Sequence, residues 1–174
     1  MYSRYPPALN EHPNLFCART LITCVNVPQL DLRSLPLAQT RSLRRDVLRP
    51  YMTVEELASH EPTDAVAFGA FDGDELVAVG LVGPEGEPGD WRVRGMATKP
   101  EARGRGAGTR VLDALVQHAT AHGARRVWCN ARTPALSLYR RAGFEATSEE
   151  FQTPRIGPHY RMELRTLPRA DRAG

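Results

Sequence analysis

A glycine-rich turn contains the first residues in this chain whose types and spacing suggest chemistry. Gly104, Gly106 and Gly108 alternate with Arg103 and Arg105, after a β-rich run and before an apolar helical repeat. The backbone N–H groups of such a turn gather at the positive end of a helix dipole. Glycines let a phosphate approach the backbone closely, and arginines add positive charge. The pattern predicts an anion-binding turn; the alternative is a plain tight turn with solvated arginines.

Two nucleotide-binding motifs are weak matches to this turn. The phosphate loop of NTPases requires a Gly-Lys pair, and the chain has none because its only lysine, Lys99, follows a threonine. A dinucleotide-binding turn requires a third glycine where the chain has Thr109, and an acidic residue at the end of the next strand, where it has Asn130. A different anion is therefore expected.

The spacing R-x-x-G-x-G, formed by Arg103, Gly106 and Gly108, resembles the pyrophosphate-binding motif of the GNAT acetyltransferases (Gcn5-related N-acetyltransferases). The segment L-Y-x-x-x-G-F at residues 138–144 also falls in the family's order, and the resemblance covers about residues 25–166. It implies an α/β fold with a mixed, mostly antiparallel sheet flanked by helices and a splayed V between central strands. It also implies acetyl-CoA as the cosubstrate and a primary amine as the acceptor.

The resemblance implies where acetyl-CoA would lie. Its pyrophosphate would contact the backbone amides of residues 103–108, its pantetheine arm would pair with strand 91–98, and a backbone N–H near Met96 would face the oxyanion. Asn130 would hold the pantetheine arm, although its spacing to Tyr139 is longer than the commoner family spacing, and it can cap the following helix instead. The predicted cofactor-binding residues are Met96, Ala97, Thr98, Arg103, Gly104, Arg105, Gly106, Ala107, Gly108, Thr109 and Asn130.

Acetyl transfer from a thioester to an amine needs a neutral amine, a stabilised oxyanion and a proton for the thiolate. Tyr139 matches the family's usual general acid, because a phenol with a pKa near 10 stays protonated at pH 7. The alternative is a half-buried tyrosine that anchors its helix. His159, Glu149 and Glu150 are the predicted candidates for the base. His159 can also bind substrate or act as a structural hydrogen-bonder, and Glu149 and Glu150 can form a solvated edge.

The elements that must position these residues follow from hydrophobic periodicity. Residues 32–49 predict a helix that begins or breaks at Pro36, and residues 53–60 predict a helix with a capping box. Gly73, between two aspartates, predicts a β-hairpin, and Gly95 predicts a bulge that splays its strand from the next. The remaining predicted elements are hairpin strands at 65–71 and 75–82, a strand at 91–98, a helix at 108–123, a strand at 125–131, a helix at 134–143, and strands at 144–151 and 159–166.

Composition bounds the class of protein. The chain has 174 residues, of which 41% are hydrophobic and 25% charged, so we expect one domain at residues 25–167 with a tail at 168–174. Residues 1–24 are expected to be a poorly ordered arm or an over-extended gene start. A net charge of +3 carried by scattered arginines indicates no nucleic-acid partner. No apolar run predicts a membrane span, and three unpaired cysteines predict a cytoplasmic protein without a metal site.

The leading hypothesis is an acetyl-CoA-dependent N-acetyltransferase that acts on a primary amine, in a small molecule or in a protein. One alternative is a sensor module that binds acyl-CoA without turnover, and another is a nucleotide-binding protein. Acceptor identity would depend on the loops at residues 50–63 and 152–160, which the sequence does not convert into a substrate. Members of the family often form dimers, so a homodimer is a further expectation of the resemblance.

Overall fold

The computed structural model describes residues 30–166, so the predicted arm at 1–24 and tail at 168–174 lie outside the described residues. In chain order the elements are β1 (Asp31–Leu35), α1 (Leu37–Leu48), α2 (Val54–Ala58), β2 (Val66–Asp72), β3 (Glu75–Pro84), β4 (Asp90–Thr98), η1 (Pro100–Ala102), α3 (Ala107–Ala121), β5 (Arg126–Arg132), η2 (Thr133–Ala135), α4 (Leu136–Arg141), β6 (Glu145–Ala146), β7 (Phe151–Thr153) and β8 (Gly157–Arg165).

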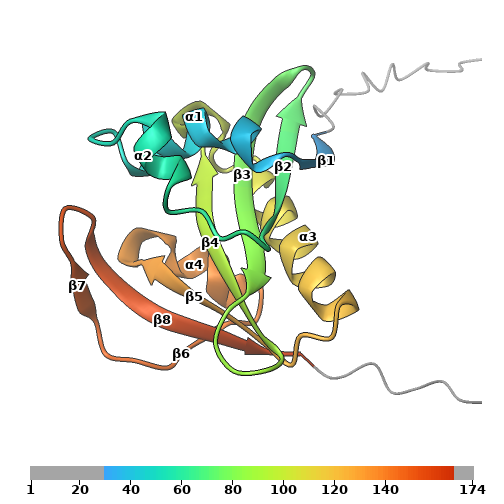
Figure 1. Ribbon diagram of the computed structural model, residues 1–174, viewed down its shortest axis with the longest axis vertical. Helices are drawn as coiled ribbons and strands as arrows, with labels where there is room; N and C mark the ends of the chain where they lie inside the picture. Colours follow the sequence, from blue (N-terminus) through green and yellow to red (C-terminus); the bar gives the residue numbers. More distant parts are fainter. Residues whose placement is uncertain (1–29, 167–174) are drawn as a thin grey trace, which may run out of the picture.

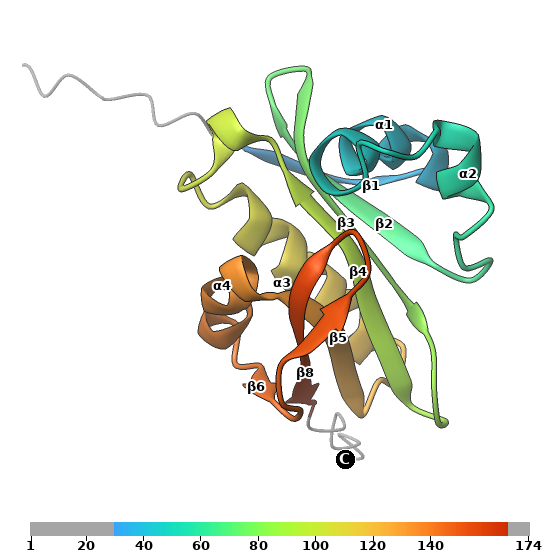
Figure 2. The same cartoon turned by 90° about the vertical axis from the view of Figure 1, so that its left-hand side faces the viewer.

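The strands form one eight-stranded sheet in the order β1-β2-β3-β4-β5-β8-β6, with β7 paired to β8 (Figure 1). Every pair is antiparallel except β4 with β5, which is parallel. In Figure 2 the sheet is seen with α1 and α2 on one side and α3 and α4 on the other. These features confirm the predicted mixed, mostly antiparallel sheet flanked by helices.

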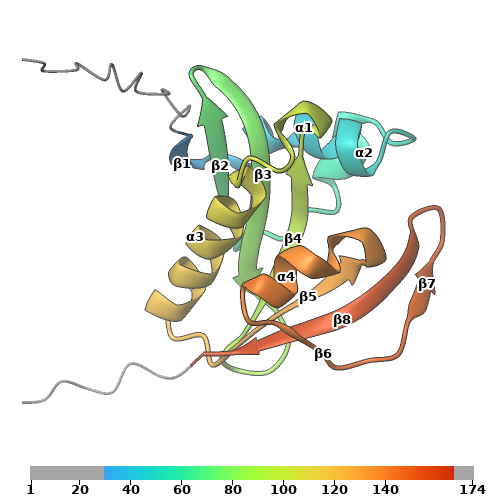
Figure 3. The same ribbon diagram turned by 180° about the vertical axis from the view of Figure 1, so that it is seen from behind.

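The centre of the sheet opens because β4 and β5 pair over only a short stretch. Three residues of β4, from Asp90 to Arg92, pair with Arg126 to Trp128 of β5, and the two strands then diverge. Figure 3 shows α3 crossing the β2–β3 side of this opening and α4 beside β5. The divergence leaves the later half of β4 without a strand partner on the β5 side. It confirms the predicted splayed V.

A β-bulge lies in the middle of β4. Gly95 has a φ of +64°, and it shares with Met96 the place opposite the single residue Gly80 of β3. Residues four apart in a regular strand share a face. Here Val93 joins the core on the α3 side while Ala97 joins the smaller cluster under α1. The bulge predicted at Gly95 is therefore confirmed, and it changes which way the following side chains point.

Local signals account for most of the elements. Thr53 and Glu56 form both hydrogen bonds of the predicted capping box at the start of α2. Gly73 turns the β2–β3 hairpin with a φ of +62°, as the Asp-Gly-Asp signal predicts. Helix α3 buries one apolar face, which includes Val111 and Leu115, against the sheet. Among residues 30–166, no helix is both long and apolar enough to cross a membrane.

The first predicted helix begins at Leu37 with Pro36 as its N-cap residue, which confirms the predicted start at Pro36. The sequence missed the strand before it: residues 31–35 pair with β2 as an edge strand, and the residue before Pro36 favours extended backbone. One further prediction of secondary structure was wrong in part. The strand predicted at 144–151 is reduced to the two residues of β6, and β7 begins only at Phe151. The intervening polar residues 147–150 have no apolar side chain to place on the core.

Candidate active site

A cavity of about 1100 Å³ lies in the opening between β4 and β5. Its walls come from both strands, α1 and the segment after it, the glycine turn with the start of α3, the η2–α4 segment, and the loop end of β8. This volume exceeds the usual range for a single drug-sized ligand. The cavity therefore has room for a cosubstrate and an acceptor together.

The glycine turn forms one end of the cavity. Gly106 is the N-cap of α3, with a φ of +83°, and no side chain caps the helix. A Cβ placed on Gly104 or Gly106 would meet no described atom within 4 Å. The first N–H groups of α3 are thus available to a ligand, and Arg103 lines the same end. This open backbone cradle fits the pyrophosphate of coenzyme A.

Most of the predicted cofactor residues meet at the cavity, and two do not. Ala97 is buried against Leu43 of α1 and does not line it. Arg105 points away, since its guanidinium pairs with Asp72 at 2.7 Å. Those that line the cavity are Met96, Thr98, Arg103, Gly104, Gly106, Ala107, Gly108, Thr109 and Asn130.

Asn130 lies on β5 at the cavity wall with an exposed side chain. The next two helical segments begin after Arg132 and Ala135, and neither of these N-cap residues forms a side-chain cap. Asn130 therefore does not take the capping role that was its alternative. Its contact with the pantetheine arm stays a prediction.

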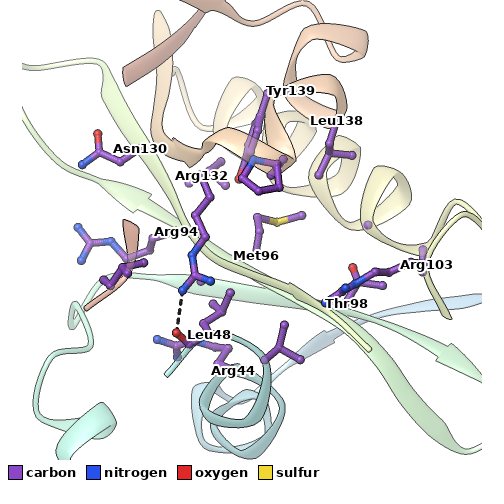
Figure 4. A pocket seen from close by; sticks show the side chains of 18 of the residues that line it. Arg44, Leu48, Arg94, Met96, Thr98, Arg103, Asn130, Arg132, Leu138 and Tyr139 are labelled. Carbon is purple, nitrogen blue, oxygen red and sulfur yellow. Dashed lines mark hydrogen bonds between the residues drawn. The ribbon is translucent and has the colours of Figure 1, made fainter. Parts of the chain in front are cut away.

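Tyr139 of α4 lines the cavity although its side chain is 5% exposed. Its ring packs edge-on against Phe144 at 5.6 Å. Burial raises the pKa of Tyr139 well above its ordinary value, and the neighbouring Cys129 thiol raises it further. Figure 4 shows Tyr139 above Met96, between Arg103 on one side and Arg132 on the other. A phenol held protonated at this central place can donate a proton to a leaving group.

His159 of β8 also lines the cavity and is buried. Its Nδ1 lies 2.8 Å from the Gly157 carbonyl oxygen, which can only accept, so Nδ1 carries a proton and, in the neutral imidazole, the lone pair is on Nε2. Glu150 is exposed and does not line the cavity; its carboxylate accepts a hydrogen bond from Thr133 at 3.1 Å. Glu149 is likewise exposed and does not line the cavity, which thus contains one of the three predicted base candidates.

Five arginines that sequence reasoning missed line the other end of the cavity. We call them the arginine cluster: Arg44 of α1, Arg49 after it, Arg92 and Arg94 of β4, and Arg132 of β5. Within residues 30–166, no aspartate or glutamate lines this cavity. Figure 4 shows Arg44, Arg94 and Arg132 on the opposite side of Met96 from Thr98 and Arg103.

The sequence contained one usable signal for the cluster. Arg92 and Arg94 alternate in a predicted strand, so they had to share a face at the V. The other members come from α1 and β5, which are far apart in sequence. Only the fold brings these segments together.

The V-shaped sheet, the backbone cradle at the start of α3 and the buried tyrosine between the two ends define a coenzyme A-dependent acyltransferase. A sequence model of the Acetyltransferase (GNAT) family matches residues 31–144. The chain belongs to that family. It is an N-acetyltransferase that uses acetyl-CoA as its cosubstrate, which confirms the resemblance seen in the sequence.

Several known proteins are similar to this chain. YitI of Bacillus subtilis strain 168, an uncharacterized N-acetyltransferase, is 28% identical over 140 residues, which cover 76% of this chain and 94% of YitI. A Bacillus subtilis acetyltransferase solved in complex with CoA has a TM-score of 0.63 at 18% identity, covering 80% of this chain and all of that one. The ribosomal-protein-S18-alanine N-acetyltransferase of Escherichia coli has a TM-score of 0.67 at 15% identity, covering 83% of this chain and 99% of that one.

Proposed function

We propose that this protein transfers the acetyl group of acetyl-CoA directly to a primary amine, with Tyr139 as the general acid. The observation that carries the proposal is the position of Tyr139 in the same cavity as the glycine cradle. Burial raises the pKa of Tyr139, so the phenol retains its proton at neutral pH and is present as a proton donor when the C–S bond breaks.

The proposed binding site for acetyl-CoA is supported by backbone groups of β4 that have no strand partner in the sheet. After Arg92, β4 has no strand on the β5 side, so its N–H and C=O groups can pair with an extended ligand. Arg103 and the first N–H groups of α3 would hold the pyrophosphate. Acetyl-CoA, when bound, supplies the activated thioester.

The acetyl transfer needs one side chain to donate a proton and one side chain to accept a proton. The lone pair of the neutral acceptor amine forms the new C–N bond, and the C–S bond breaks. Tyr139 gives its phenolic proton to the thiolate, and Nε2 of His159 takes the proton that the amine nitrogen loses. The free Nε2 and its place in the cavity support His159 over Glu150. Proton exchange with solvent then returns both side chains to their starting states.

Replacing Tyr139 with phenylalanine tests this proposal. Tyr139→Phe keeps the ring that packs on Phe144 but removes the acidic proton, so kcat should fall about 10- to 1000-fold. The Kd for acetyl-CoA, measured by calorimetry with ATP and NADH as controls, should stay within about twofold. Tyr160→Phe is the matched control, because Tyr160 packs on the core outside the cavity.

An unchanged kcat in Tyr139→Phe would remove Tyr139 from the mechanism. Saturable binding of acetyl-CoA by the wild-type protein without thiol release from any amine would instead indicate a sensor of acyl-CoA.

A further inference from the structure

The arginine cluster lies at the acceptor end of the cavity, away from the glycine turn. Arg94 and Thr98 are four residues apart on β4, which corresponds to about 13 Å along a strand. Met96 lies between them, and Figure 4 shows Tyr139 facing this middle position. The cosubstrate's phosphates bind beyond Thr98, so they do not account for the charges on the other side of Met96.

Carboxylates behind the cavity neutralise only part of this charge. Glu85 pairs with both Arg92 and Arg94, and Glu61 pairs with Arg44 at 2.6 Å. Glu61 is also shared with Arg41, which does not line the cavity. The five arginines of the cluster therefore line the cavity with two carboxylates as their acidic partners, and each of these carboxylates serves two arginines.

Two donor atoms of the cluster have no hydrogen-bond partner in the described chain. Arg44 is 6% exposed, and its buried Nε has no hydrogen-bond partner among residues 30–166. The Nε of Arg92 is likewise buried without a partner there. The recorded partner of Arg132 is neutral, since its guanidinium donates to the Leu48 carbonyl oxygen at 2.7 Å. Both Nε atoms are buried from solvent, and that of Arg44 lies against Gly95, so they add to the energetic cost of burying the cluster and do not themselves face a ligand.

The cluster members also raise one another's energy. Burial lowers the pKa of Arg94, and the charge of Arg44 lowers it further. Burial lowers the pKa of Arg132, and Arg49 adds to this effect. All of them remain charged at neutral pH. A negative group placed among them would relieve this repulsion.

We propose that the acceptor of this N-acetyltransferase is a small amine that carries a carboxylate, and that the arginine cluster binds this carboxylate. The inference rests on the proposed function, because it assigns the second substrate of the same cavity. Arginine forks match carboxylates in bidentate geometry, which fixes the position of the acceptor as well as its charge. The positive charge of the arginine cluster repels polycationic acceptors such as polyamines and aminoglycosides.

The cluster also assists the reaction. Nearby positive charges disfavour the ammonium form of the acceptor and so increase the fraction of neutral, nucleophilic amine. The cavity has no acidic side chain among its described lining residues, so it offers no carboxylate that would stabilise the ammonium. The positive charge of the arginine cluster therefore favours loss of the ammonium proton, so a weaker base is enough to deprotonate the acceptor.

Matched pairs of amines test the inference with the full chain. Thiol release from saturating acetyl-CoA is measured with each natural L-amino acid, with its α-carboxamide and with spermidine. The amide has the lower ammonium pKa and offers more neutral amine, so intrinsic reactivity favours the amide. A kcat/KM at least tenfold higher for an amino acid than for its amide would show that the carboxylate is bound.

Substitution of Arg132 locates the binding site. Arg132→Gln should lower kcat/KM for the preferred amino acid about 10- to 100-fold, lower it at most about threefold for the amide, and leave the Kd for acetyl-CoA unchanged. Arg132→Lys, which keeps the charge, should recover part of the loss. Arg33→Gln is the control, because Arg33 is an exposed residue of β1 that pairs with Asp31.

Each other outcome overturns the inference in a distinguishable way. If the amides or spermidine react as well as the amino acids, the inference that the acceptor carries a carboxylate is refuted. The release of thiol would still support the proposed N-acetyltransferase function. Binding of acetyl-CoA without release from any amino acid would refute the inference as well. Failure of the folded protein to bind acetyl-CoA would refute the proposed function itself, and this inference with it.

Discussion

Substituting alanine at Gly95 tests the packing that joins the bulge to the arginine cluster. A Cβ at this position would lie 2.7 Å from Nε of Arg44 and 3.3 Å from its Cδ and Cζ, inside normal contact distance. Arg44 cannot yield easily, because it is buried and its guanidinium is held by Glu61 at 2.6 Å. Gly95→Ala therefore strains the backbone and displaces a buried ion pair.

The two costs can be separated with a second glycine. Gly73 has a φ of +62°, against +64° for Gly95, but a Cβ on Gly73 would meet nothing within 4 Å. Gly73→Ala should lower the free energy of unfolding by about 1–2 kcal/mol, the cost of a left-handed alanine. Gly95→Ala should lower it by about 2.5–5 kcal/mol, since weakening a buried charged contact adds about 1.5–3 kcal/mol.

Urea denaturation of both variants, followed by circular dichroism, measures the difference. In the double variant Gly95→Ala/Arg44→Ala, the added cost at Gly95 should disappear, because the side chain that the methyl group displaces is gone. Losses that agree within about 0.5 kcal/mol for Gly95→Ala and Gly73→Ala would show that Arg44 does not pack against the bulge.

Two further predictions concern the cosubstrate end and the core. Arg103→Gln should raise the Kd for acetyl-CoA about five- to tenfold by calorimetry, and Arg105→Gln should raise it at most about twofold because Arg105 pairs with Asp72; equal effects would contradict the assignment. Burial raises the pKa of Cys129 to about 12, so the folded state keeps a proton that the unfolded state releases near pH 8.5. The free energy of unfolding should therefore fall by up to about 1.4 kcal/mol per pH unit as the pH rises from about 9 towards 12. Cys129→Ala should make this decline shallower, and an identical slope in both proteins would refute the argument.

The parts of the fold that the sequence predicted are those encoded by neighbouring residues. The hairpin at Gly73, the capping box at Thr53 and the turn before α3 each depend on a few consecutive side chains and backbone angles. The residues at the cosubstrate end of the cavity could be predicted for the same reason, because the glycines and the strand beside them are contiguous in sequence. Tyr139 was assigned through a motif on its own helix.

The parts that escaped prediction depend on contacts between distant segments. Strand β1 has no regular apolar alternation, and it is a strand because β2, more than thirty residues later, offers an edge for pairing. The arginine cluster is likewise non-local. Its charges looked scattered in the sequence, and the diverging β4 and β5 gather them into one cavity with α1. A charge pattern of this kind has no linear signature.

The bulge at Gly95 also bears on how the two substrates meet. Before it, Arg94 points to the side of the sheet where α1 and Arg44 lie; after it, Thr98 lies against Gly108 at the start of α3, on the other side. In the proposed arrangement, the acceptor and the cosubstrate would approach the reacting atoms from opposite faces of one strand, and neither would have to pass through the binding site of the other. Substitutions before the bulge would then change which acceptor is preferred, and the affinity for coenzyme A, which depends on residues after the bulge, would stay the same.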